Sequence, residues 1–252
     1  MHNLGQTRSS QQPNHLLLTP DTFVRTTLPG MKACSAIVHV SPALGARFTQ
    51  YTAEFEAGGE LGETAAQRFI FVIEGDVRVE AEGKSHELSA RGYSYLPQGS
   101  PHRIAAAKAS RVAVLEKHYQ AVDSVRPPHL IISNEDAISS HPLGDDPALQ
   151  VKCLLPDQPP DAMSFDFAVN TMVYQPGAAL SMVEMHVMEH GLIMLEGGGI
   201  YRLGDSWYPV TAGDFIWMGA WCPQWFGAIG KVPAKYLIYK DWNRHPLASS
   251  QP

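Results

Sequence analysis

The sequence predicts an all-β fold of two tandem jelly-roll barrels, and two observations predict it. The first is an internal repeat: when the 252-residue chain is laid over itself at an offset of about half its length, residues 68–75 match residues 190–197, and both runs end in Glu-Gly. The second is a rhythm of short apolar runs broken by glycine, as at residues 78–81 and 93–96. This rhythm is typical of a double-sheet jelly roll.

The repeat extends through each half of the chain. After the Glu-Gly pair, a second matching run begins at Gly92 in the first half and at Gly213 in the second. Each half then ends in an apolar run that closes on lysine, at residues 112–117 and 236–240. A repeat of this length favours two domains of ordinary size over one large domain.

Turn residues and proline set the predicted domain boundaries. Residues 1–40 read as an N-terminal arm with short strands, because turn signals interrupt them. Residues 41–125 form the first barrel and residues 161–252 the second. Between them, residues 126–160 are rich in proline and read as an inter-domain linker.

Composition excludes several classes of function. The net charge is −6 and there is no basic run, so nucleic acid is not an expected partner. No apolar stretch reaches the length of a membrane span, and the first residues are polar, so membrane binding is not expected either. The three cysteines, Cys34, Cys153 and Cys222, are odd in number and far apart. They favour a reducing compartment, and we expect a cytoplasmic protein.

A metal site is predicted between Gly177 and Gly197. Glu184 and His186 stand two residues apart, so on a β-strand both side chains leave the same face. His190 can join them from across a tight connection. Carboxylate and imidazole ligands suit Mn, Fe, Ni or Zn rather than an ion that prefers thiolates.

The same letters allow a second interpretation. Residues 186–190 spell H-x-x-E-H, a pattern in which two histidines one helical turn apart hold zinc in one class of metalloprotease. That site needs a helix, which the local residue types would tolerate. The strand-type repeat around it favours the sheet interpretation.

The second half of the repeat resembles the consensus motifs of the cupin superfamily, in which three ligands and a glycine are followed by G-x5-P-x-G-x2-H. Gln224 stands where this pattern places its last histidine, while Met218 and Ala220 replace its proline and glycine. The resemblance therefore implies that Gln224 is a fourth ligand, and the alternative is a glutamine that only forms hydrogen bonds in the pocket. An amide oxygen in this position suits Mn²⁺ better than zinc.

The first half keeps only part of the same motif. It retains His102. When Gly75 is aligned with Gly197, however, the three ligands Glu184, His186 and His190 of the second half are replaced in the first half by Gly62, Thr64 and Arg68. The first barrel is therefore predicted to hold no metal, and His102 to be an ordinary hydrogen-bonded histidine.

Over nearly its whole length the chain is similar to the (S)-ureidoglycine aminohydrolase family, manganese-dependent bicupin enzymes of purine catabolism. The segments LLLTPDTFVRTTLPG, GIYRLGDSWYPV and YLIYKDWNR carry this resemblance. It implies a homo-oligomer with one Mn²⁺ per chain. The residues it implies are the ligands Glu184, His186, His190 and Gln224, and the substrate contacts Tyr201, Tyr236 and Lys240.

The reaction implied is hydrolytic loss of ammonia from (S)-2-ureidoglycine, which gives ureidoglycolate. Lys240 lies four residues after Tyr236, so on one strand both point the same way, and Lys240 would neutralise the substrate carboxylate. Glu184 would coordinate the metal or accept a proton. Two alternatives stay open: another bicupin metalloenzyme such as a dioxygenase or isomerase, and a bicupin binding or storage protein without activity.

Overall fold

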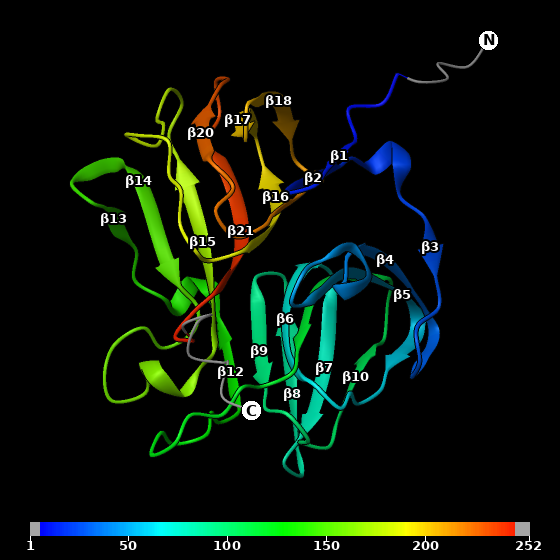
Figure 1. Cartoon of the computed structure of the whole chain (residues 1–252). Coiled ribbons are helices and arrows are strands. Elements are labelled where there is room, and N and C mark those ends of the chain that lie inside the picture. Colours follow the sequence, from blue (N-terminus) through cyan, green and yellow to red (C-terminus); the bar gives the residue numbers. More distant parts are fainter. Residues whose placement is uncertain (1–5, 245–252) are drawn as a thin grey trace. The chain divides into compact units, whose positions relative to one another are not determined.

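The computed structural model describes residues 6–244 of the chain (Figure 1). Strands make up its regular structure, together with four single-turn 3₁₀ helices: η1 (Pro20–Thr22), η2 (Pro42–Leu44), η3 (Glu135–Ala137) and η4 (Ala162–Ser164). Residues 6–244 contain no α-helix, which confirms the predicted all-β class. The helical interpretation of H-x-x-E-H is wrong, because residues 186–189 are not helical and His190 begins a strand.

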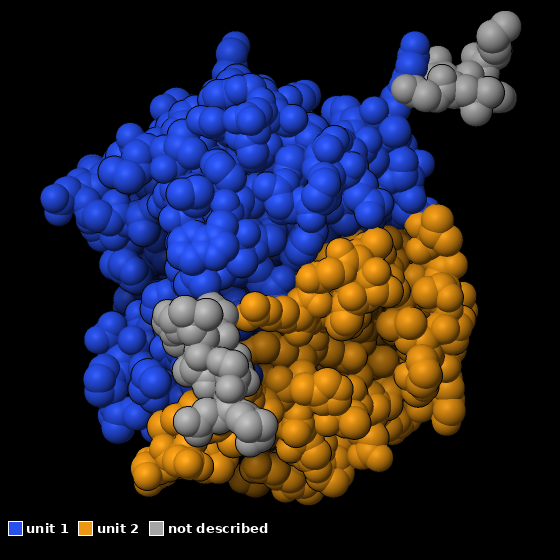
Figure 2. All heavy atoms as spheres, in the orientation of Figure 1, with its two compact units in different colours: residues 1–23, 139–252 blue, residues 24–138 orange. Residues whose placement is uncertain are grey.

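Two compact units divide the chain, and Figure 2 colours them separately. Unit 1 comprises residues 1–23 and 139–252, and unit 2 comprises residues 24–138. Each unit holds one of the two predicted barrels. The predicted N-terminal arm is shared between the units, and the predicted domain boundaries stay predictions.

Unit 2 is a strongly bent antiparallel sheet. Its ladder order is β12-β9-β6-β11-β5-β10-β7-β8, with β4 paired to β5 and β3 paired to β4. Its strands are β3 (Arg25–Thr26), β4 (Met31–Val40), β5 (Thr49–Leu61), β6 (Gln67–Glu74), β7 (Asp76–Ala81), β8 (Lys84–Ser89), β9 (Gly92–Leu96), β10 (His102–Ala106), β11 (Ser110–Lys117) and β12 (Ile131–Asn134).

The long strand β5 folds this sheet over on itself. Residues 49–55 pair with β11, whereas residues 59–61 pair with β10. Between them, Gly58 has φ +77°, and a Cβ at Gly59 would lie 2.4 Å from the carbonyl oxygen of Ala33. Only glycine fits both conditions without strain. The two halves of the sheet therefore enclose one apolar core, which includes Ile70 and Val112 from one half and Val79 and Ile104 from the other.

Unit 1 contains two sheets. The larger has the order β1-β2-β19-β16-β21-β15-β14-β13, and the smaller has the order β18-β17-β20. The strands are β1 (Ser10–Gln12), β2 (His15–Leu18), β13 (His141–Leu143), β14 (Asp146–Cys153), β15 (Phe167–Tyr174), β16 (His190–Glu196), β17 (Gly198–Leu203), β18 (Ser206–Thr211), β19 (Phe215–Met218), β20 (Gln224–Ala228) and β21 (Ala234–Asp241).

The two units share a strand order, which supports the internal repeat. β9-β6-β11-β5 in unit 2 corresponds to β19-β16-β21-β15 in unit 1. In unit 1, side chains at alternate positions of β21, such as Tyr236 and Ile238, join one buried cluster with Tyr201 and Phe226 of the smaller sheet. The prediction of two tandem jelly-roll barrels is confirmed.

Residues early in the chain complete the larger sheet of unit 1. Strand β2 pairs with β19, so that His15 lies opposite Met218. Arg8 reinforces this pairing, because its guanidinium binds both oxygens of the buried Asp214 carboxylate at 2.5 and 2.9 Å. The bidentate geometry makes this a strong charge-assisted contact.

Two further expectations concern the chain as a whole. Cys34, Cys153 and Cys222 are free thiols. The part of the chain that the structure describes holds no helix able to span a membrane.

Candidate metal and substrate pocket

A cavity of about 60 Å³ lies within unit 1, among side chains of both of its sheets. Its apolar lining includes Leu143, Met172, Leu180, Met188 and Ile238. All seven site residues predicted from the sequence line this one cavity: Glu184, His186, His190, Tyr201, Gln224, Tyr236 and Lys240. The structure therefore brings together residues that lie up to 56 positions apart in the sequence.

The segment between β15 and β16 carries Glu184 and His186, and it is not a regular strand. Backbone hydrogen bonds fix it instead. Glu184 N–H donates to the Gln224 carbonyl at 2.8 Å, and Gln224 N–H donates back to the Glu184 carbonyl at 2.9 Å. Trp221 N–H donates to the His186 carbonyl at 2.8 Å. The prediction that Glu184 and His186 share a β-strand is thus wrong in detail, although both side chains line the same cavity.

Two imidazoles face each other across the cavity. The Nε2 atoms of His186 and His190 lie 3.2 Å apart. On its other side, His190 Nδ1 lies 3.2 Å from the carbonyl oxygen of Tyr239, to which it donates. That bond fixes the tautomer and leaves the Nε2 lone pair of His190 directed at His186. Burial lowers the pKa of His190 well below its usual value, so the ring is neutral.

Gln224 and Glu184 approach the same pair of imidazoles. The side-chain amide of Gln224 lies 2.9 Å from His186 Nε2, and Tyr201 donates a hydrogen bond to Gln224 Oε1 at 3.2 Å. A half-turn of the amide exchanges its oxygen and nitrogen without moving the side chain. The Glu184 carboxylate lies further out, 3.9 Å from His186 Nε2.

This donor set fits a divalent metal ion in chemistry and largely in spacing. Ligands bonded at roughly 2.0–2.1 Å stand about 2.9 Å apart at octahedral angles and about 3.4 Å apart at tetrahedral angles. The separations of 3.2 and 2.9 Å fall in this range. Within residues 6–244, however, no three His, Cys, Asp or Glu side chains are placed as a metal ion would hold them. Glu184 would have to move inward, and Gln224 would supply its amide oxygen.

Lys240 brings an unpaired cation to the cavity. Its side chain is half-buried, and it forms no ion pair or hydrogen bond with any of the residues that the structure describes. Burial lowers its pKa, while the nearby Cys153 and Glu184 act in the opposite direction. An unpaired ammonium in such a place is suited to an anionic ligand.

Tyr174 is a polar neighbour of the site that the sequence reasoning missed. It lies behind the lining, and its hydroxyl is 2.7 Å from that of Tyr236. The alternation of residues 167–174 could have placed Tyr174 on the inner face of its strand, but no ligand motif includes it. The apolar lining residue Leu143 was also missed, because it lies on β13, within the predicted linker.

Unit 2 uses the equivalent positions differently. Arg68 Nη1 donates to the Gly62 carbonyl at 2.6 Å and to His102 Nε2 at 2.8 Å, while Arg68 Nη2 lies 2.6 Å from Glu116 Oε1. His102 Nδ1 lies 2.7 Å from the Ser100 carbonyl, to which it donates. Both imidazole nitrogens are therefore occupied, as expected of an ordinary hydrogen-bonded histidine.

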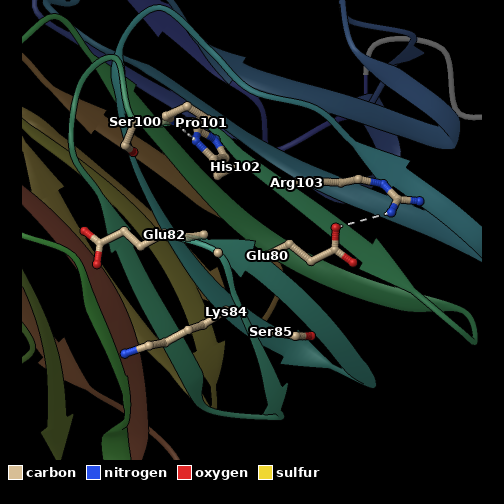
Figure 3. Close-up of a pocket in the computed structure, with 10 residues that line it drawn as sticks. Glu80, Glu82, Lys84, Ser85, Ser100, Pro101, His102 and Arg103 are labelled. Atoms are coloured by element: carbon tan, nitrogen blue, oxygen red, sulfur yellow. Dashed lines mark hydrogen bonds and ion pairs between the residues drawn. The ribbon is translucent and has the colours of Figure 1, made fainter.

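A larger cavity of about 600 Å³ lies beside His102 (Figure 3). It is open, and charged side chains line it, among them Arg103 and Glu80, which pair with each other at 3.4 Å. Volume alone would select this cavity. The smaller cavity of unit 1 is the better candidate, because it brings together two imidazoles, a carboxylate and an unpaired lysine.

Comparison with known proteins shows which family the chain belongs to. A cupin domain model matches residues 170–239, and an EutQ-like cupin domain model matches residues 43–119. An Arabidopsis thaliana protein named (S)-ureidoglycine aminohydrolase is 38% identical over 248 residues, which is 96% of this chain and 80% of that protein. The crystal structure of Ylba from E. coli superposes with a TM-score of 0.83 at 31% identity and covers 96% of this chain and 97% of Ylba.

A more distant likeness concerns the fold alone. Oxalate decarboxylase of Bacillus subtilis, studied for its Mn(II) centres, superposes with a TM-score of 0.64 at 12% identity, covering 94% of this chain and 80% of that one. The two cupin domains, the shared strand order and the identity over nearly the full length lead to one conclusion. The chain belongs to the (S)-ureidoglycine aminohydrolase family, two-domain members of the cupin superfamily.

Proposed function

We propose that this protein hydrolyses (S)-2-ureidoglycine to (S)-ureidoglycolate and ammonia, with one Mn²⁺ per chain in unit 1. The observation that carries the proposal is the meeting of two imidazoles, a carboxylate, an amide and an unpaired lysine in one cavity. The family to which the chain belongs supplies the substrate.

Glu184, His186, His190 and Gln224 would hold the ion. When bound, such an ion polarises the reacting centre and lowers the pKa of water. Two imidazoles with carboxylate and amide oxygens suit manganese, whereas structural zinc sites most often use thiolates and imidazoles. The Mn(II) centres of oxalate decarboxylase, which shares the fold, are consistent with this choice.

The chain's own side chains would bind and orient the substrate. Lys240 would neutralise the carboxylate, since it has no other partner among the described residues. Tyr236 lies on the same face of β21, about 13 Å along the strand from Lys240 between Cα atoms, so it would contact the opposite end of the substrate. The apolar side chains of Met172, Leu180 and Ile238 would exclude larger ligands.

Glu184 would move the proton that the reaction requires. In the hydrolysis, a bond from C2 to a water oxygen replaces the bond from C2 to the amine nitrogen. One water proton stays on the new hydroxyl group, and Glu184 would accept the other and deliver it to the departing amine. Atoms balance, since water and ureidoglycine become ureidoglycolate and ammonia. The side chain of Glu184 is 38% exposed, which leaves it room to move between these positions.

The test is direct. The purified protein is incubated with (S)-2-ureidoglycine with oxygen excluded, and ammonia release and the configuration of the ureidoglycolate are followed. We expect release faster than in the protein-free control, and an S product. His186→Ala is the matched inactive variant. Release no faster than the control would contradict the proposal, and a requirement for oxygen would indicate a dioxygenase instead.

The expected cytoplasmic location and homo-oligomer belong to this proposal too. The three free thiols are consistent with a reducing compartment. Light scattering of the full chain measures the oligomeric state. A monomer at all concentrations would contradict the expected homo-oligomer.

A further inference from the structure

The hydroxyl groups of Tyr174 and Tyr236 form a hydrogen bond, and the packing around them determines which of the two donates. The two oxygens lie 2.7 Å apart, and both side chains are fully buried. Burial raises the pKa of each phenol, so each is neutral and carries one proton. The pair therefore has two O–H donors to place but only one hydrogen bond between its members.

Tyr174 has the fewer choices. Its hydroxyl has one polar partner within residues 6–244, the oxygen of Tyr236, and it does not line the cavity. Its ring packs edge-on against Phe226 at 4.9 Å between centroids, which holds it in place. A buried donor without an acceptor costs about 1–3 kcal/mol, so the proton of Tyr174 goes to Tyr236.

Tyr236 lines the cavity and has a second direction available. Once its oxygen accepts from Tyr174, its own proton has no acceptor there and turns toward the cavity. We propose that Tyr174 is a positioning residue that makes Tyr236 a hydrogen-bond donor to the ligand and thereby selects ligands with an acceptor oxygen at that end of the cavity.

This inference rests on the proposed function and adds to it. With the carboxylate at Lys240, the far end of ureidoglycine is its ureido group, whose carbonyl oxygen would accept from Tyr236. A ligand of the same shape with N–H donors in that place would be disfavoured, because two donors would face each other.

The experiment uses two probes that lack the C2 amine and so cannot release ammonia by the proposed reaction. N-carbamoylglycine presents a carbonyl oxygen, and guanidinoacetate presents N–H groups at the same position. Dissociation constants of both are measured by calorimetry for the metal-loaded full chain and for Tyr174→Phe, Tyr236→Phe and the double variant. Tyr208→Phe is the matched control, since its hydroxyl bonds to His15 and Ser10.

In Tyr174→Phe we expect the preference for N-carbamoylglycine over guanidinoacetate to fall about three- to tenfold, the worth of one neutral hydrogen bond. In the Tyr236→Phe background the same change should alter the preference less than about twofold, because Tyr174 acts through Tyr236. Tyr208→Phe should leave it unchanged. A merely structural role would weaken both probes equally and leave the preference constant.

Two outcomes overturn the inference. The first is that Tyr174→Phe leaves the preference for N-carbamoylglycine unchanged, or that the effects of Tyr174→Phe and Tyr236→Phe on this preference add. Tyr174 would then not be the donor that orients the Tyr236 hydroxyl. In that case, turnover of (S)-2-ureidoglycine by the wild-type protein would leave the proposed function standing. If the wild-type protein neither turns over ureidoglycine nor binds N-carbamoylglycine, both fail together.

Discussion

In unit 2, the guanidinium of Arg68 donates a hydrogen bond to Nε2 of His102 at 2.8 Å. Arg68 stands at the repeat position of His190, and His102 closes the same motif in its own half. In unit 2 the guanidinium of Arg68 thus lies at the position where unit 1 has its predicted metal ligands. Arg68 also pairs with Glu116, and the Tyr51 hydroxyl donates to the same carboxylate at 2.9 Å.

We expect this arginine to stabilise unit 2. Arg68→Met keeps much of the volume but removes the charged partner of Glu116 and leaves the Gly62 carbonyl without its donor. The expected loss is about 3 kcal/mol, the lower end of the range for breaking a buried pair, because Glu116 remains 19% exposed. Urea unfolding measures it. The double variant Arg68→Met/Glu116→Gln should be less damaged, and equal damage would mean that the charge pair is not the cause.

Metal should bind to one unit only. We expect about one Mn²⁺ per chain by elemental analysis, since Gly62, Thr64 and Arg68 cannot replace the three ligands of unit 1. His102→Ala should leave the metal content unchanged. Two equivalents per chain, or loss of metal in His102→Ala, would show that unit 2 binds metal as well.

Removal of one imidazole should abolish both metal binding and activity. In His190→Ala, the remaining donors leave the ion weakly held, and the Tyr239 carbonyl loses its hydrogen bond from His190. Metal content and ammonia release are measured on the same sample. Full activity in a sample without metal would refute the assignment of His190 as a ligand.

Lys240 should separate substrate binding from metal binding. Lys240→Met keeps the apolar stem but removes a charge-assisted contact worth roughly 2–4 kcal/mol. The catalytic efficiency should fall about 30- to 800-fold, since each 1.4 kcal/mol is tenfold, while metal content stays constant. Lys117→Met, at the lysine that ends the corresponding strand of unit 2, is the control and should retain turnover, although the strand pairing places Glu116 rather than Lys117 at the position equivalent to Lys240. Equal losses in both variants would mean that these lysines are structural.

Stability should fall in acid because of His39. Burial, with a smaller effect of Arg111, lowers the pKa of His39 to about 3, so the folded protein keeps this ring neutral. The unfolded chain takes up the proton below about pH 6.5, so His39 stabilises the fold above that pH and loses this effect as the pH falls toward 3. At pH 5 the loss is about 2 kcal/mol.

Urea unfolding of the wild type and of His39→Asn at pH 7 and pH 5 measures this contribution. Because His39 Nε2 lies 2.8 Å from Thr52 Oγ1, asparagine keeps a polar group of smaller size there. The variant should show the smaller difference in free energy of unfolding between the two pH values. An identical difference in both proteins would assign the acid sensitivity to other groups.

The sequence predicted those features that depend on spacing. The Glu-Gly pairs and the closing lysines predicted two equivalent barrels, and the strand orders of the two units agree. The seven predicted site residues share one cavity because β21 alternates its faces and because Glu184 pairs with Gln224 through the backbone. Patterns of period two and motif spacings are local properties, so a sequence displays them directly.

Features that depend on long-range pairing were not predicted. Strand β2 joins the larger sheet of unit 1 through β19, about 200 residues later, and no local pattern in residues 15–18 specifies that partner. The Tyr174 hydroxyl pairs with Tyr236 across neighbouring strands whose register appears only in the fold. In unit 2, the alignment showed that ligands were lost but not that the Arg68 side chain would bond to His102.

The pairing of β2 with β19 has a consequence for the order in which the protein is made. Residues 6–23 are synthesised long before their partners, β19 and Asp214. Residues 24–138 contain every strand of their own sheet and can form it while synthesis continues. The apolar side chains of Leu16 and Leu17 therefore stay uncovered until the chain has passed residue 218. A chain interrupted earlier lacks the strand that pairs with β2.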